Sequence, residues 1–215
     1  MEERLEDYLL STLDDKKPWV SEMEQYAKEH HVPIMEPLGI ELLQQLIRIK
    51  RPKKILEIGT AIGYSALRML EAYPQANIYT IERDEERFHV AQEYIHSQEV
   101  EDKISLIFGD ALETTSLVKE NGPFDLLFID AAKGQYQVFF EQYSPLLSED
   151  GMVISDNVLF KGLVANQSGD NKRLDQIAQK IKRYNEYLVN HPRYKTTILP
   201  VGDGVAISVK RDKSE

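Results

Sequence analysis

Two short stretches of this sequence place oxygen-bearing side chains directly after an apolar run. Asp130 follows the run 125–129, and the pair Asp156-Asn157 follows the run 151–155. Runs of this kind are typical of buried strands, and neighbouring parallel strands end at one edge of a sheet. The two carboxylates and the amide are therefore expected to converge. Three oxygen ligands suit Mg²⁺, and zinc is disfavoured because no His or Cys lies among them.

Lys133 lies three residues after Asp130 and adds a candidate base. A hydroxyl group is a poor nucleophile while it is protonated, and a bound Mg²⁺ favours its ionised form. A partly desolvated lysine beside the metal could take the proton, so Lys133 and Asp130 are the predicted catalytic residues. The alternative is that Lys133 is an ordinary surface lysine. The favoured chemistry is attack by an oxygen nucleophile on a reactant aligned beside it.

A second group of residues has the spacing of a nucleoside-binding site. The segment 57–65, EIGTAIGYS, lies at a strand-to-helix turn, where glycine lets the backbone approach a ligand closely. Glu82 lies 23 residues after Gly59, at the end of the next strand, where a carboxylate can accept hydrogen bonds from both ribose hydroxyls. Asp110 follows the third strand and is placed to bind an adenine amino group, with the backbone of Ala111 beside it.

The residues of the turn at 57–65 also help to distinguish a dinucleotide from S-adenosylmethionine as the cofactor. It lacks the third glycine of the dinucleotide pattern, and a pyrophosphate would need helix-end amides and preferably a cation. Glu57 is expected to face the loop and to suit the positive methionine end of S-adenosylmethionine, so methyl transfer is favoured over hydride transfer. In the plainer alternatives, Glu57 caps a helix and Glu82 is a surface acid. The predicted cofactor contacts are Glu57, Gly59, Thr60, Gly63, Tyr64, Ser65, Glu82, Arg83, Asp110, Ala111 and Asp130.

Alternating apolar runs and helical patterns must position these residues. The predicted strands are 54–59, 77–82, 104–110, 125–130 and 151–156, and the helices between them are 63–70, 85–97 and 136–147. This alternation predicts an α/β fold with a doubly wound, mostly parallel sheet. The tail 196–209 reads as two strands around Gly202-Asp203-Gly204, which predicts an antiparallel C-terminal edge.

Extra helices precede this sheet. Residues 1–35 predict two helices with a break at 17–19, and a further helical pattern follows Pro37. A chain of 215 residues with 42% hydrophobic content can form one domain with its own core, so residues 1–215 are predicted to be a single domain in which 1–35 form a helical cap.

Composition limits the cellular compartment in which the protein is expected. The sequence contains no cysteine, which excludes disulfides and zinc–thiolate sites. The N-terminus is acidic and unlike a signal peptide, and no apolar stretch approaches the roughly 20 residues that cross a bilayer. We therefore expect a cytoplasmic protein without membrane contact.

The net charge of −10 argues weakly against a nucleic-acid partner, because phosphate contacts need Lys and Arg. The run 48–54, RIKRPKK, is an exception with five basic residues and no acid, although it also fits a solvated turn. Trp19 could stack on a base or pack between the N-terminal helices. The candidate RNA contacts are Lys16, Lys17, Arg48, Lys50, Arg51, Lys53, Lys54 and Lys161.

Four separated motifs give the sequence a family resemblance. EIGTAIGYS, FDLLFIDAAKGQY, GMVISDNVLFKG and PVGDG together resemble the metal-dependent O-methyltransferases, from about Pro33 almost to the C-terminus. The resemblance implies a Rossmann-like methyltransferase fold, S-adenosylmethionine and Mg²⁺ as cofactors, and the metal, base and ribose roles given above. It also implies that Ser65 lies near the methionine part, that Met35 belongs to a segment closing over the cofactor, and that the protein is a homodimer.

Within this family, the whole chain resembles the bacterial tRNA 5-hydroxyuridine methyltransferases. The resemblance implies the tRNA anticodon loop as partner and conversion of wobble 5-hydroxyuridine to 5-methoxyuridine. The 5-hydroxyl and 4-carbonyl oxygens are adjacent and could chelate one Mg²⁺ as a catechol does, and a loop base is exposed. Two alternatives stay open: a small catechol-like or other vicinal phenol as acceptor, and a non-catalytic nucleotide-binding module. The N-terminal helices and the loop 161–170 are expected to choose the acceptor.

Overall fold

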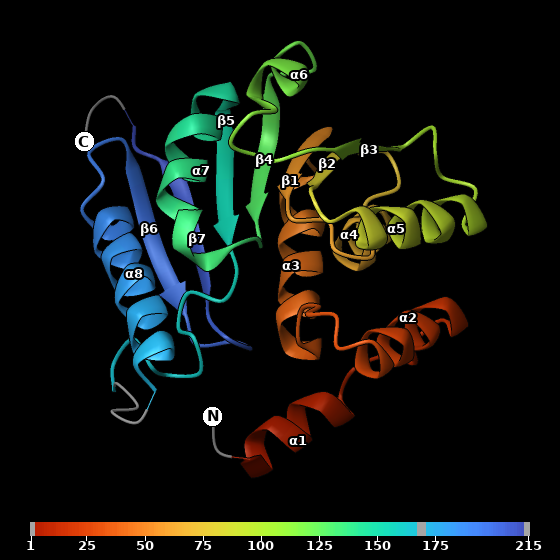
Figure 1. Ribbon diagram of the computed structural model, residues 1–215, viewed down its shortest axis with the longest axis horizontal. Coiled ribbons are helices and arrows are strands. Elements are labelled where there is room, and N and C mark those ends of the chain that lie inside the picture. The colour runs from red at the N-terminus through yellow and green to blue at the C-terminus, as the bar shows by residue number, and fades with distance from the viewer. Residues whose placement is uncertain (1–2, 167–170, 213–215) are drawn as a thin grey trace.

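Seven strands form one mixed sheet in the computed structural model, which describes residues 3–166 and 171–212 (Figure 1). The strand order is β3-β2-β1-β4-β5-β7-β6. The strands are β1 (Lys54–Ile58), β2 (Asn77–Glu82), β3 (Ile104–Phe108), β4 (Phe124–Ile129), β5 (Leu147–Ser155), β6 (Tyr194–Leu199) and β7 (Val205–Lys210).

The first five strands are parallel, and β7 runs antiparallel to both β5 and β6. The predicted α/β class, parallel sheet and antiparallel C-terminal edge are confirmed. The register brings the carboxyl ends of the strands together, because Ile58 of β1 lies beside Ile81 of β2 and Ile129 of β4. After β3 the chain returns to the other side of β1, so β1 and β4 flank the switch point where ligands bind in such sheets.

Helices cover both faces of the sheet because successive side chains of a buried strand point to opposite layers. Ile55 of β1 packs with α2 to α5, whereas its neighbour Leu56 packs with α6 to α8. In Figure 1, α1 and α2 lie toward the end of the molecule at which the arrows of β4 and β5 point. The helices are α1 (Glu3–Ser11), α2 (Pro18–Glu29), α3 (Pro37–Lys50), α4 (Tyr64–Ala72), α5 (Glu85–Ser97), α6 (Thr115–Lys119), α7 (Tyr136–Tyr143) and α8 (Lys172–Val189).

Most predicted elements are present, with shifted boundaries around α7. The break at 17–19 separates α1 from α2, and the pattern after Pro37 is α3. The predicted helix 136–147 ends at Tyr143, because a 3₁₀ turn, Ser144–Leu146, contains a proline at its centre. The strand predicted from 151 already begins at Leu147, which pairs with Phe124.

Two helices were not predicted. The five residues of α6 are too few to show a helical period. The pattern of α8 is clear in retrospect, since its buried side chains Ala178, Ile181, Tyr184 and Leu188 recur at three or four residues. Residues 167–170, the end of the loop expected to help choose the acceptor, lie outside the described ranges. Within those ranges, every helix is too short or too polar to span a bilayer.

Candidate active site

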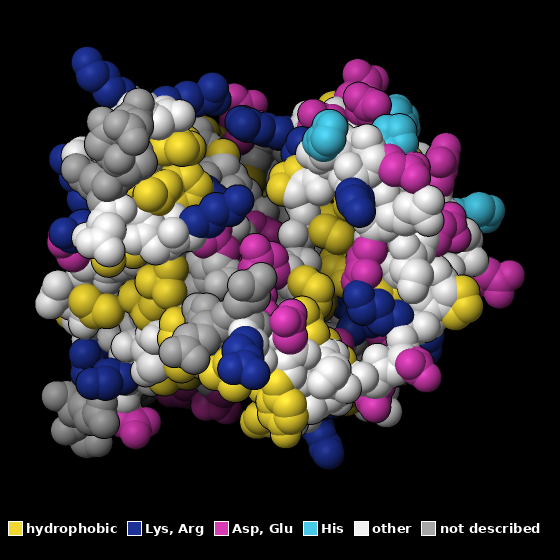
Figure 2. All heavy atoms as spheres, turned by 90° about the horizontal axis from the view of Figure 1, so that it is seen from below, with side chains coloured by type: hydrophobic (Ala, Val, Ile, Leu, Met, Phe, Trp, Pro, Cys, Tyr) yellow, Lys and Arg dark blue, Asp and Glu magenta, His cyan; other side chains and the backbone are white. Residues whose placement is uncertain are grey.

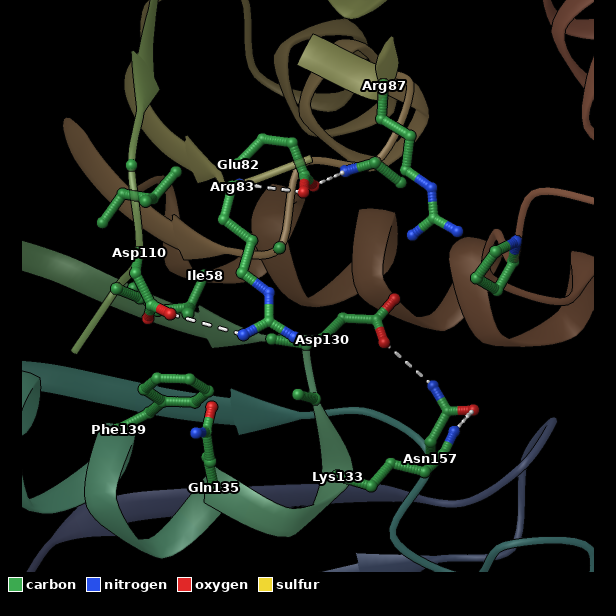
Figure 3. Close-up of a pocket in the computed structure, with 18 of the residues that line it drawn as sticks. Ile58, Glu82, Arg83, Arg87, Asp110, Asp130, Lys133, Gln135, Phe139 and Asn157 are labelled. Carbon is green, nitrogen blue, oxygen red and sulfur yellow. Dashed lines mark hydrogen bonds and ion pairs between the residues drawn. The ribbon is translucent and has the colours of Figure 1, made fainter. Parts of the chain in front are cut away.

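A pocket of about 290 Å³ opens at the carboxyl ends of β1, β2 and β4. Figure 3 shows that Asp110, Gln135 and Phe139 lie toward one end of it, that Lys133 and Asn157 lie toward the other, and that the carboxylate of Asp130 is between the two ends. The acids predicted from the strand ends therefore meet at one place. This size and this position are typical of a site for a small cofactor.

Gly59 allows the turn after β1 to pass the end of β4. Its φ is +102°, and a Cβ atom there would lie 2.0 Å from the carbonyl oxygen of Asp130. The backbone amides of Gly59 and Thr60 both donate hydrogen bonds to the carbonyl of Ile81, at 3.1 and 3.2 Å. The close approach predicted here was to a ligand, whereas Gly59 itself approaches the chain's own backbone.

The carboxylate of Glu82 is fixed by the backbone around it. One oxygen accepts a hydrogen bond from Ala61 N at 2.8 Å, and the other accepts from Arg83 N at 2.9 Å and Asp84 N at 2.8 Å. The residue is only 7% exposed, so it is not a free surface acid. A carboxylate held in this way still presents lone pairs to the pocket, as a ribose-binding residue requires.

Asp110 lines the pocket beside Ala111, as predicted. One of its carboxylate oxygens accepts from Leu112 N at 2.9 Å, and the other accepts from Arg83 Nη1 at 3.3 Å. Figure 3 shows the Arg83 side chain reaching across the pocket to this carboxylate. Each oxygen of Asp110 thus already accepts one hydrogen bond. Arg83 links Asp110 to Glu82, because its guanidinium donates to Asp110 and its backbone amide donates to Glu82.

The predicted metal ligands and the predicted base form one hydrogen-bonded cluster. Asn157 Nδ2 donates to Asp130 Oδ1 at 3.0 Å and to Asp156 Oδ2 at 2.9 Å. Lys133 Nζ donates to Asn157 Oδ1 at 2.8 Å. These distances confirm that the two carboxylates and the amide converge, and they place Lys133 beside them.

The turn between β6 and β7 supports this cluster from outside. Val158 N donates to Gly204 O at 3.0 Å, and Leu159 N donates to Asp203 O at 2.9 Å. Gly204 has a φ of +89°, and a Cβ atom there would lie 2.3 Å from Leu159 Cγ. The late motif PVGDG therefore holds the loop that begins at Asn157.

The donor set fits a hard cation, although the described residues contain no group of three His, Cys, Asp or Glu side chains at one metal-sized site. Burial raises the pKa of Asp130 to about 6, with Lys133 opposing the shift. Burial and the neighbouring Asp130 raise the pKa of Asp156 well above its usual range. Two crowded carboxylates of this kind are relieved by a bound cation. The amide of Asn157 could present its oxygen instead of its nitrogen by a half-turn, which gives three oxygen ligands.

Glu57 does not face the loop as predicted. It is fully buried, and it accepts hydrogen bonds from the hydroxyl of Ser65 and from Thr80 Oγ1, the latter at 2.6 Å. Position 57 lies on the face of β1 that packs against α4, beneath the turn. The capping alternative is also wrong, because the N-cap of α4 is Gly63, without a side-chain cap. The hydrogen bonds that Glu57 accepts from Ser65 and Thr80 therefore stabilise the turn and do not bind the cofactor.

Three other predicted cofactor contacts also turn away from the pocket. Thr60 Oγ1 lies 2.5 Å from Thr80 Oγ1, and Tyr64 OH donates to Glu24 of α2 at 2.9 Å. Met35 is buried in the core shared with α2 to α4. Its neighbours in the sequence, Pro33 and Ile34, line the pocket instead, so the segment closes over the site with different residues from the one expected.

Substituting Glu57 with glutamine should reveal the energetic cost of the buried carboxylate. Burial raises the pKa of Glu57 from 4.5 to about 7, so the carboxyl contributes stability below pH 4.5 that is lost as the pH rises toward 7. Glutamine keeps the shape and has no such dependence. The free energy of unfolding should therefore shift in favour of Glu57→Gln by on the order of 3 kcal/mol across this window. Urea titrations at several pH values measure the difference, and a gap that does not vary with pH would contradict the assignment.

The basic run 48–54 lies at the wrong edge of the sheet for contact with a group in the pocket. Lys54 is the first residue of β1, whose carboxyl end is roughly 13 Å further along the strand. Lys50 Nζ donates to Asp150 O at 2.5 Å, and Lys54 Nζ donates to Asn121 O at 2.7 Å. Only a remote part of a large ligand could reach Arg48, Lys50, Arg51, Lys53 and Lys54.

The other predicted basic contacts are divided between side chains in ion pairs and an exposed one. Lys16 pairs with Glu24 at 2.6 Å, and Lys17 pairs with Glu71 at 2.9 Å. Lys161 is exposed and follows Phe160, whose ring centroid lies 5.4 Å from the Lys133 ammonium. Lys161 is thus the predicted RNA contact that lies beside the active site. Trp19 is partly buried against the core, which favours packing over stacking.

Arg87, Gln135 and Phe139 are among the pocket residues that were not predicted. Arg87 lies five residues after Glu82 in the first turn of α5, and Figure 3 shows its side chain directed toward the pocket. Gln135 and Phe139 lie on the segment after Lys133, one turn of helix apart. The sequence signal for all three is their nearness to a predicted site residue.

Comparisons with known proteins extend over nearly the whole chain. A family model described as O-methyltransferase matches residues 11–211. A catechol O-methyltransferase from Niastella koreensis is 34% identical over 178 residues, which are 79% of this chain and 78% of that protein. A Staphylococcus aureus structure, provisionally named a caffeoyl-CoA O-methyltransferase, is 37% identical with a TM-score of 0.87 and covers 97% of this chain and 98% of that one. The SAH-bound methyltransferase PaMTH1 from Podospora anserina is 27% identical with a TM-score of 0.86, over 99% and 97% of the two chains.

Proposed function

This chain belongs to the O-methyltransferase family and uses S-adenosylmethionine, and from that premise we propose that it methylates a hydroxyl group next to a second oxygen, with the help of a divalent cation. The observation that carries the proposal is the cluster of two carboxylates and one amide beside Lys133, at the end of the pocket away from Asp110. Asp130, Asp156 and Asn157 would hold the ion. Mg²⁺ suits these oxygen donors.

The proposed roles divide the pocket into two halves. Glu82 holds the ribose, and the adenine lies toward Asp110, Ala111 and Phe139. The sulfonium then lies near Asp130, between the nucleoside half and the cluster at Asn157. A cation held by Asp130, Asp156 and Asn157 would favour the ionised form of the acceptor hydroxyl.

Lys133 removes the acceptor proton in the proposed mechanism. Its uncharged amine takes the hydroxyl proton, and the oxygen attacks the methyl carbon as the carbon–sulfur bond breaks, leaving neutral S-adenosylhomocysteine. In the structure, Lys133 Nζ lies 2.8 Å from the Asn157 amide, so the base is held beside the cluster. Holding donor and acceptor in line accounts for much of the rate.

For the acceptor, we propose 5-hydroxyuridine of a tRNA anticodon loop. Support comes from the overall resemblance described above and from cations at the pocket, where Arg83 and Arg87 line the wall and Lys161 is exposed nearby. Figure 2 shows Lys and Arg interspersed with Asp and Glu on the face at the carboxyl edge, so the contacts would be local ones. The names of the catechol and caffeoyl-CoA relatives support the alternative, a small vicinal phenol. A homodimer remains part of the proposal.

Parallel assays with two acceptors test the substrate. Transfer of a labelled methyl group to tRNA from a strain that lacks this enzyme is compared with transfer to caffeate. We expect tRNA to be methylated, and methylation of caffeate alone would overturn the tRNA proposal.

Lys161→Gln should separate the two kinds of acceptor. Because Lys161 lies beside the site, its loss should lower the rate with tRNA several-fold by removing a phosphate contact, and it should leave the rate with caffeate unchanged. Lys195→Gln, an exposed lysine near the start of β6 and outside the candidate RNA contacts, is the matched control and should change neither rate. Equal rates for wild type and Lys161→Gln on tRNA would remove this residue from the RNA interface.

A further inference from the structure

One acceptor in the pocket is buried without a hydrogen-bond partner. Oε1 of Gln135 is inaccessible to solvent, and no donor among the described residues reaches it. Gln135 lines the pocket, and Figure 3 shows its carboxamide beside the ring of Phe139, at the end where Asp110 lies. Buried side-chain oxygens almost always have a partner, so this one invites a ligand.

The carboxamide of Gln135 is not needed to hold the local backbone. Gln135 ends the 3₁₀ turn Lys133–Gln135, and its backbone amide donates to Ala132 O at 2.9 Å. As the residue that precedes α7, it could cap the helix, but its side chain makes no capping hydrogen bond. The side chain is therefore available to the pocket.

The side-chain carboxylates on this side of the pocket already accept hydrogen bonds from the protein. Asp110 accepts from Leu112 N and from Arg83, one hydrogen bond on each oxygen. Glu82 accepts three backbone hydrogen bonds and faces the ribose in the proposed arrangement. Among these side chains in the described part of the chain, Gln135 Oε1 is thus the acceptor that holds no hydrogen bond.

We propose that Gln135 is a specificity-determining residue that recognises the cofactor's base as adenine, by accepting a hydrogen bond from the exocyclic amino group. Hypoxanthine carries a carbonyl oxygen at that position. This oxygen would face the Gln135 carboxamide oxygen, and two acceptors cannot form a hydrogen bond. The inference rests on the proposed function only in placing the nucleoside half of the cofactor at Asp110 and Phe139. It does not depend on the metal or on the methyl acceptor.

Calorimetric binding of S-adenosylhomocysteine and S-inosylhomocysteine tests the proposal. Wild type should prefer the adenine compound by about five- to tenfold, the ratio that one hydrogen bond of average strength or slightly more supplies. Gln135→Leu should bind S-adenosylhomocysteine about tenfold more weakly and S-inosylhomocysteine within about twofold of wild type. Gln135→Glu keeps an acceptor and should restore the preference. Gln137→Leu, an exposed change on α7, is the control and should alter neither affinity.

Three results would overturn the inference. Equal weakening of both compounds by Gln135→Leu would show a structural role, and unchanged affinities would show no role. A wild-type preference for S-inosylhomocysteine would mean that the amide nitrogen faces the base, which also contradicts it. If wild type bound neither compound, the proposed function itself would fail and this inference with it, so the two failures are distinguishable.

Discussion

Replacing Asp130 by alanine is expected to lower turnover by about 10³-fold, since a divalent cation supplies several kcal/mol to reactions of this kind. In the proposed site, Asp130 is a ligand of the cation and lies between the nucleoside half of the pocket and the cluster at Asn157. Its removal leaves Asp156 as the one carboxylate of the predicted set. Steady-state kinetics with the preferred acceptor measure the loss.

A second ligand variant separates metal binding from cofactor binding. Asp156 lies 2.9 Å from the Asn157 amide and does not line the pocket, so Asp156→Ala should lose turnover comparably while S-adenosylhomocysteine still binds. Asp150→Ala, an exposed acid at the other edge of the sheet, is the control and should be fully active. Turnover in Asp130→Ala that is near normal and still abolished by EDTA would show that the cation binds elsewhere.

Replacing Lys133 by methionine should lower kcat by about 10²- to 10⁴-fold, the usual contribution of a general base. The Lys133 ammonium touches Asn157 Oδ1 at 2.8 Å and lies over the ring of Phe160, so the side chain is held beside the cluster. Methionine has a similar length and cannot accept a proton. Binding of S-adenosylhomocysteine should stay within a few-fold of wild type, because Lys133 lies at the other end of the pocket from Asp110.

Lys133→Arg distinguishes a base from a fixed positive charge. Arginine preserves the charge, and it does not deprotonate in proteins. If Lys133 acts as the base, the arginine variant should be as slow as the methionine variant. An arginine variant with nearly normal kcat would show that the residue stabilises charge only, and another group would have to take the proton.

The sequence was most informative at the strand ends. Asp130, Asp156 and Asn157 each follow an apolar run, and parallel strands place such positions at one edge, so their convergence could be predicted without coordinates. The orientation of Glu57 could not, because a residue inside a strand faces either layer of the sheet. Here position 57 faces α4, where Ser65 and Thr80 hold its carboxylate beneath the turn.

The basic run 48–54 shows a different limit. Its composition is compatible with RNA binding, but its place depends on which end of β1 it adjoins, and it adjoins the end away from the pocket. Gln135 and Arg87 lie on turns and helix starts, whose side-chain directions depend on the packing of neighbouring segments. Periodicity carries no information about such directions. It is plain in α8, although that helix was not predicted.

The most direct test of the account is methyl transfer by wild type after removal of divalent ions with EDTA and after addition of Mg²⁺. The cluster at Asp130, Asp156 and Asn157 predicts that turnover disappears in EDTA and returns with Mg²⁺, while S-adenosylhomocysteine binds under both conditions. Full turnover in excess EDTA would contradict the central claim that these side chains hold a catalytic cation.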